Sequence, residues 1–183
     1  MTYEFIRLDI DSLILIKPKV FYDDRGFFME TYTKNEFYEH GIKEEFVQDN
    51  HSRSIKNTIR GLHFQFPPHS QAKLVRCIAG TIMDVVVDLR EEKHSFGKHV
   101  KVMLSAENKH MLYIPEGFAH GFLVLSDYAE IIYKVSKFYN KDSESGIIWN
   151  DLDLGIDWGV KTPILSDKDR SWPKLADIKS KLR

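Results

Sequence analysis

Short runs of β-branched and aromatic residues, separated by turns rich in Gly, Pro or Asp, fill most of the first 140 residues. The run Thr81–Arg90 alternates with a period of two, and Met83, Val85, Val87 and Leu89 form one strongly apolar face. Similar runs predict about eight or more strands, at Leu13–Ile16, Phe27–Tyr32, Lys73–Ile78, Val100–Leu104, Met111–Ile114, Phe122–Leu125 and Glu130–Phe138. This spacing is typical of antiparallel sandwiches and barrels, so the predicted class is all-β.

Helical signals are few. The segment Lys34–His40 predicts a short surface helix that ends at Gly41. After residue 140 the pattern changes to scattered Trp, Asp, Gly and Pro, which predicts a tail that wraps the barrel and carries a little helix near its end. The chain has no repeat, low-complexity run or Ser/Gly linker, so we expect residues 1–183 to form a single domain.

Composition excludes several classes of function. The 183 residues carry 26 Lys and Arg against 27 Asp and Glu, and a net charge of -1 gives no field that would hold a nucleic acid. Cys77 is the only cysteine, which excludes an internal disulfide and any multi-cysteine metal site. The N-terminal segment mixes charges with short apolar runs, so we expect no signal peptide, no membrane partner and a cytoplasmic location.

Two histidines lie in surroundings that suggest a site. His120 belongs to Pro-Glu-Gly-Phe-Ala-His, which resembles the second motif of the cupin superfamily of small β-barrels. His63 lies where the first cupin motif begins, but Gln65 replaces the second metal-binding His and no Glu follows before Gly80. A metal needs three or more converging ligands, so we expect no metal. A metal-dependent cupin dioxygenase stays an alternative, which stoichiometric iron, nickel or zinc would revive.

Six segments in register carry a closer resemblance. They are Phe-Tyr-Asp-Asp-Arg-Gly at 21–26, Gln-Asp-Asn at 48–50, Arg-Gly-Leu-His-Phe-Gln at 60–65, Lys-Leu-Val at 73–75, Ile-Pro-Glu-Gly-Phe-Ala-His-Gly-Phe at 114–122 and Ser-Asp-Lys-Asp at 166–169. Together they resemble the dTDP-4-dehydrorhamnose 3,5-epimerase family across nearly the whole chain. The resemblance implies a cupin-like double-stranded β-helix, or jelly-roll barrel, with a few short helices.

The resemblance also implies a reaction. It predicts epimerisation at C3 and C5 of dTDP-4-dehydro-6-deoxy-D-glucose to dTDP-4-dehydro-L-rhamnose, through an enolate and without a cofactor. The predicted base is His63, because the pKa of a histidine lies near working pH, and Asp169 would orient it. Tyr133 would protonate the opposite face, and Lys73 would stabilise the enolate near the keto oxygen.

Substrate-binding residues follow from the same match. The diphosphate favours arginine, and Arg60 and Arg25 are the candidates. The remaining matched positions contact the base, nucleotide or sugar, or support the catalytic base: Phe21, Glu30, Gln48, Asn50, His120 and Tyr139. The resemblance further implies a homodimer acting on a dTDP-linked sugar.

Strand geometry adds one requirement that the structure can test. In an unbroken strand Arg60 and His63 would point to opposite faces, so both can reach one pocket only across a bulge, and Gly61 is the expected place.

Two further alternatives remain open from the sequence. One is a C3-only epimerase of a related nucleotide-linked 4-keto-6-deoxy sugar. The other is a non-catalytic cupin that binds a sugar nucleotide through Arg60, in which Tyr133 and Asp169 would have no role. Taken alone, His63 in a strand would more often be a structural histidine, and Lys73 a charged residue that guards an edge strand.

Overall fold

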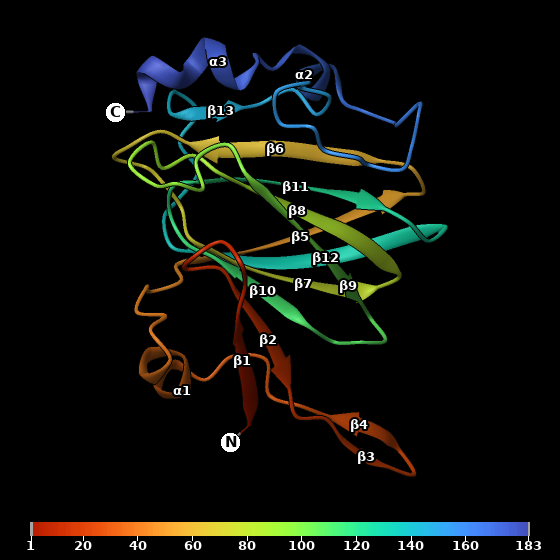
Figure 1. The fold of residues 1–183 in the computed structure, drawn as a ribbon. Coiled ribbons are helices and arrows are strands. Elements are labelled where there is room, and N and C mark those ends of the chain that lie inside the picture. Colours follow the sequence, from red (N-terminus) through yellow and green to blue (C-terminus); the bar gives the residue numbers. More distant parts are fainter. Residues whose placement is uncertain (1, 183) are drawn as a thin grey trace.

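In the computed structural model, residues 2–182 are described, and they build two facing β-sheets that form a cupin-like barrel (Figure 1). The six-stranded sheet has the order β1-β2-β10-β7-β12-β5, with β1 Tyr3–Arg7, β2 Ile14–Pro18, β10 Met111–Ile114, β7 Lys73–Ala79, β12 Tyr128–Val135 and β5 Gln48–Ile55. The five-stranded sheet has the order β13-β6-β11-β8-β9, with β13 Glu144–Gly146, β6 Ile59–Gln65, β11 Phe118–Val124, β8 Thr81–Asp88 and β9 His99–Ser105. The all-β prediction is confirmed.

The smaller elements lie outside the barrel. The strands β3 (Phe21–Asp23) and β4 (Gly26–Phe28) form a hairpin that pairs with no other strand within residues 2–182. Helix α1 (Lys34–Glu39) confirms the early helix, although Phe37 turns inward and is fully buried. The tail crosses the outer face of the five-stranded sheet and carries α2 (Asp167–Ser171), α3 (Leu175–Ile178) and a 3₁₀ turn, η1 (Lys179–Lys181), as Figure 1 shows.

Three apolar clusters hold these layers together, and the alternation in β8 connects two of them. Ile82 and Val86 point into the barrel, whereas Val85 and Val87 pack under the C-terminal tail. Both faces of β8 are therefore buried, and Asp84 lies on the interior one with no exposed surface. The third cluster lies between the six-stranded sheet and α1.

Two sequence expectations need correction. The predicted strand Phe27–Tyr32 ends at Phe28, because in the described part of the chain β4 pairs with β3 alone and residues 29–32 have no neighbouring strand. The strand β5 was missed, because its sequence, Gln-Asp-Asn-His-Ser-Arg-Ser-Ile, is almost wholly polar. It forms an edge of the larger sheet, paired along its full length to β12. No helix among residues 2–182 is long and apolar enough to cross a membrane.

Candidate functional site

A histidine and an aspartate that lie 106 positions apart in sequence meet at the mouth of the barrel. His63 Nε2 lies 2.5 Å from Asp169 Oδ1, and their side chains are 36% and 6% exposed. Burial raises the pKa of Asp169, but the hydrogen bond and charge of His63, with hydrogen bonds from Ser166 and Trp172, outweigh it and lower the pKa. An ionised carboxylate can accept hydrogen bonds but cannot donate them. When His63 is neutral, its proton is therefore on Nε2, which donates to Asp169, and Nδ1 keeps a lone pair. That is the arrangement a general base needs.

Helix α2 fixes the carboxylate of this pair. Ser166 is its N-cap: its hydroxyl accepts from the Asp169 backbone N–H at 3.1 Å and donates to Asp169 Oδ2 at 2.8 Å. Trp172 Nε1 donates to Oδ1 at 3.3 Å. Both carboxylate oxygens of Asp169 are thereby held, and the side chain cannot turn away from His63.

The bulge expected in β6 is present. His63 lies opposite His120 and Arg60 opposite Phe122, so three steps along β6 match two along β11. Gly61 occupies the extra position with φ +133°, and a Cβ there would lie 2.4 Å from Gly121 Cα. Because of the extra residue, Arg60 and His63 line the same cavity.

That cavity has a volume of about 620 Å³ and opens to solvent between β5, β6 and the tail. Its polar lining is mostly charged: Arg53, Arg60, His63, Glu144, Lys168 and Asp169. Arg60 Nε donates to Ser54 Oγ at 2.8 Å and its Nη2 to the Arg53 carbonyl at 3.3 Å, so its guanidinium is oriented by β5. The arginines and the lysine supply the cationic groups that a diphosphate requires.

Three charged lining residues were missed by the sequence analysis: Arg53, Glu144 and Lys168. Glu144 Oε2 accepts from both Lys168 Nζ and the Tyr139 hydroxyl, the latter at 2.7 Å. Lys168 precedes Asp169 within the quoted Ser-Asp-Lys-Asp motif and could have been taken from it, whereas Glu144 follows a charged stretch with no local signal. Tyr139, expected to stack on a base, lies half exposed beside this cluster.

The opposite wall of the barrel carries Tyr133. On β12 it lies opposite Asn50 of β5 and Val75 of β7, and directly opposed residues point to one face, here the interior. Gln48 shares that face and donates to Asn50 Oδ1 at 2.7 Å. Burial raises the pKa of Tyr133, while the charge of Arg60 acts in the opposite direction. The phenol therefore stays protonated at neutral pH and can act as an acid.

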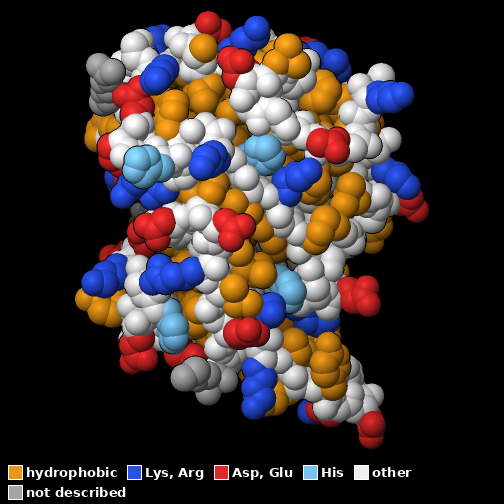
Figure 2. Space-filling model, in the orientation of Figure 1, with side chains coloured by type: hydrophobic (Ala, Val, Ile, Leu, Met, Phe, Trp, Pro, Cys, Tyr) orange, Lys and Arg blue, Asp and Glu red, His pale blue; other side chains and the backbone are white. Residues whose placement is uncertain are grey.

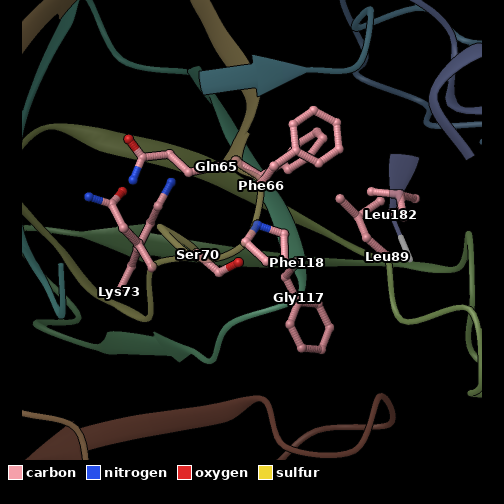
Figure 3. A pocket seen from close by; sticks show the side chains of 11 residues that line it. Gln65, Phe66, Ser70, Lys73, Leu89, Gly117, Phe118 and Leu182 are labelled. Carbon is pink, nitrogen blue, oxygen red and sulfur yellow. The ribbon is translucent and has the colours of Figure 1, made fainter. Parts of the chain in front are cut away.

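Lys73 and His120 lie deeper in the barrel. Burial lowers the pKa of Lys73 to about 8, against the raising effect of Asp84. Lys73 lines a second, smaller cavity of about 70 Å³ together with Gln65, and Figure 3 shows the two side chains pointing toward one another. His120 Nε2 lies 2.7 Å from Asp84 Oδ1. Burial lowers the pKa of His120, Asp84 opposes this, and the charges of Lys73 and His63 lower it further.

Three predicted binding residues are not brought to this site. Phe21 and Arg25 lie on the β3–β4 hairpin and Glu30 follows it, at the end of the molecule opposite α2 and β6 (Figure 1). The hairpin projects from the body with hydrophobic side chains along it (Figure 2). Its four aromatic residues are 47–69% exposed: Phe21, Tyr22, Phe27 and Phe28.

A metal centre has no counterpart in the described part of the chain. Within residues 2–182, no group of three or more His, Cys, Asp or Glu side chains converges in a way that could hold a metal ion. His63 and His120, the histidines at the cupin motif positions, are each bonded through Nε2 to a carboxylate, Asp169 and Asp84 respectively.

Known proteins resemble this chain over most of its length. A family model described as dTDP-4-dehydrorhamnose 3,5-epimerase matches residues 7–177. A protein of that name from Shigella flexneri is 54% identical over 173 residues, which cover 94% of this chain and 96% of that protein. The crystal structure of dTDP-6-deoxy-D-glucose-3,5-epimerase from Legionella pneumophila with dTDP-4-keto-L-rhamnose superposes with a TM-score of 0.94 at 44% identity, covering 98% and 96% of the chains. The crystal structure of ChmJ, a 3'-monoepimerase from Streptomyces bikiniensis, in complex with dTDP-quinovose superposes with a TM-score of 0.89 at 32% identity. The match covers 95% of this chain and 89% of that chain.

Proposed function

Because the chain belongs to the dTDP-4-dehydrorhamnose 3,5-epimerase family, we propose that it inverts C3 and C5 of dTDP-4-dehydro-6-deoxy-D-glucose with His63 as base. The observation that carries this proposal is the His63–Asp169 pair, which opens into a cavity lined by Arg60, while the facing barrel wall carries the partly buried phenol of Tyr133. The product is dTDP-4-dehydro-L-rhamnose.

In the first step His63 removes the proton from the carbon beside the C4 ketone. The C–H electron pair forms a carbon–carbon double bond, and the carbonyl electrons move to the C4 oxygen to give an enolate. Asp169 stabilises the imidazolium that forms, and protonated Lys73 stabilises the charge on oxygen. The substrate's own ketone acidifies the C–H bond, so the chemistry needs no redox cofactor.

In the second step Tyr133 returns a proton to the opposite face of the same carbon, and the ketone re-forms. The base and the acid come from β6 and β12, which belong to the two facing sheets. Acid–base groups each contribute roughly 10²–10⁴-fold to rate, and an oxyanion donor about 10²–10³-fold. Repeating the two steps at the second carbon gives the double inversion.

The nucleotide is held by the groups around Arg60. We propose that Arg60 binds the diphosphate and that Gln48, Asn50 and His120 contact the nucleotide or sugar. Tyr139 stacks on the base from the cavity rim, where its hydroxyl is tied to Glu144.

Phe21, Arg25 and Glu30 lie at the opposite end of the same chain, on or after a hairpin that exposes four aromatic side chains. We propose a homodimer in which each hairpin completes the other copy's cavity. An exposed aromatic hairpin that carries substrate-binding residues but lies away from its own cavity supports this arrangement. The single-domain organisation and the cytoplasmic location expected from the sequence stay predictions.

A C3-only reaction is the second candidate, and the similarity to the 3'-monoepimerase ChmJ is the observation that favours it. Relatives named as 3,5-epimerases are 38–54% identical to this chain, which favours the double inversion.

Proton NMR in D₂O of the metal-stripped protein with dTDP-4-dehydro-6-deoxy-D-glucose separates the candidates. Deuterium at both C3 and C5 supports the double epimerase, and deuterium at C3 alone supports the second candidate. No exchange at either carbon overturns both and leaves the sugar-nucleotide binding module.

A further inference from the structure

Asp84 is a buried carboxylate that the mechanism above does not use. It lies on β8, its exposure is 0%, and it points into the barrel. One carboxylate oxygen, Oδ1, lies 2.7 Å from His120 Nε2. The other, Oδ2, is buried without a hydrogen-bond partner among the described residues. A buried carboxylate that is only half satisfied is costly, so a compensating role is expected.

The charges that face Asp84 come from the surrounding strands. On β7, the amine of Lys73 and the thiol of Cys77 both interact with the charge of Asp84. On β11, His120 interacts with Asp84 and also with the charge of His63 on β6. Lys73 is 8% exposed and lines the small cavity. Asp84 is therefore the negative charge that opposes the loss of the proton from Lys73.

We propose that Asp84 is a positioning residue for the epimerisation, which keeps Lys73 cationic for the enolate oxygen and holds His120 by Nε2 so that only its Nδ1 is free for another partner. This inference rests on the proposed function, because Lys73 must meet the enolate for its charge to matter. Asp84 has no surface and lines neither the large nor the small cavity, so it acts through its neighbours rather than on the substrate.

Asp88 provides a matched comparison on the same strand. It is also 0% exposed, but its carboxylate accepts from Arg90 Nη2 at 2.6 Å, from the Arg90 backbone N–H at 2.9 Å and from Ser95 Oγ at 2.6 Å. Arg90 also donates to Ser12 and to the Asp11 carbonyl, so this cluster ties two loops together. Asp88 is fully satisfied by structural partners, and its charge does not act on Lys73.

The test is Asp84→Asn in the full chain, because Asn keeps an acceptor for His120 and removes the charge. Because the protonated fraction of Lys73 falls, we expect kcat to decrease at least about twofold at pH 7 and about fivefold at pH 8, while KM stays within about threefold. In the profile of kcat against pH, the alkaline limb, where kcat declines, should occur at a pH about one unit lower, or lower still, than in the wild type. Asp88→Asn should lower the unfolding temperature and leave that limb in place. A limb that does not move in Asp84→Asn, or that moves equally in Asp88→Asn, overturns the proposal.

A second readout does not depend on catalysis. NMR titration of ¹⁵N-lysine in the wild type and in Asp84→Asn should show the Lys73 amine losing its proton about one pH unit lower in the variant. An inactive wild type would overturn the proposed function, and this titration would still decide the counter-ion role. If Asp84→Asn does not fold, Asp84→Glu keeps the charge and should retain the limb at the wild-type pH with a reduced kcat. A lowered limb in Asp84→Glu would contradict the proposal.

Discussion

Lys73 is the residue whose titration most directly tests the proposed stabilisation of the enolate. Its amine is buried inside the barrel, and burial lowers its pKa to about 8. The protonated form stabilises an enolate, so activity should be present below pH 8 and decline as the pH rises through this value. We expect a kcat profile with an alkaline limb near pH 8, measured by the initial rate of deuterium exchange.

Lys73→Arg is the matched variant for that limb. A guanidinium holds its proton beyond pH 12, so the variant should be slower but should show no alkaline limb from this position. A limb that stays near pH 8 in Lys73→Arg would assign it to another group and contradict the role of Lys73.

Single residues were predicted from the sequence where a motif surrounded them. His63, Asp169 and Arg60 meet at one cavity as expected, because each sits in a quoted motif. Glu144 and Asp84 were missed for a physical reason. Glu144 reaches the cavity only through the fold of the tail, and Asp84 looks like the polar half of an alternating strand although both faces of that strand are buried.

At the scale of elements, the bulge in β6 is the feature on which the site depends. Gly61→Ala should destabilise the protein by roughly 3 kcal/mol, because a Cβ would meet the backbone of β11 at 2.4 Å from Gly121 Cα and 2.9 Å from the His120 carbonyl. Since the bulge aligns Arg60 with His63, kcat should fall and KM rise together. Urea unfolding and steady-state kinetics measure both effects.

Gly26→Ala is the control for backbone strain. Gly26 has a similar φ of +136°, but a Cβ there would have nothing within 4 Å. We expect it to cost only about 1–2 kcal/mol. Equal losses of stability in Gly61→Ala and Gly26→Ala would show that the close approach of β6 to β11 contributes nothing.

The tail makes a separate contribution through the cap of α2. Ser166→Ala removes the hydroxyl that bonds both the backbone N–H and the carboxylate of Asp169, and should cost about 1 kcal/mol with a several-fold lower kcat. Thermal unfolding and kinetics check the two effects, and Ser166→Thr should restore both. A variant with the activity of the wild type would mean that Asp169 is held sufficiently by Trp172 and His63 alone.

Elements were predictable where apolar periodicity was strong and were missed where pairing alone defines a strand. The runs at Lys73–Ile78 and Met111–Ile114 were recovered because both supply core residues. The polar strand β5 exists because β12 offers it a hydrogen-bonding edge, which its own sequence does not reveal. For the opposite reason, the predicted strand Phe27–Tyr32 stops early, because none of the described strands lies beside residues 29–32.

At the scale of the whole molecule, the β3–β4 hairpin and the cavity beside α2 and β6 lie at opposite ends of the chain's fold. Mixing Arg25→Ala chains with His63→Ala chains tests the proposed homodimer. If each hairpin serves the other copy, a mixed dimer contains one site with both residues intact, and random exchange of subunits should restore activity at about a quarter of the sites. Two inactive variants that stay inactive after mixing, in a sample shown to contain mixed dimers, would place the hairpin and cavity contributions in the same chain.

The proposed mechanism depends most on His63, held by Asp169, acting as the base. The most direct test is the rate of solvent deuterium incorporation at C3 and C5 in His63→Asn, alongside its affinity for dTDP. We expect dTDP binding to be retained and exchange at both carbons to fall at least about 10²-fold. Exchange that continues at the wild-type rate at either carbon would contradict the role of His63 and assign proton abstraction there to another residue.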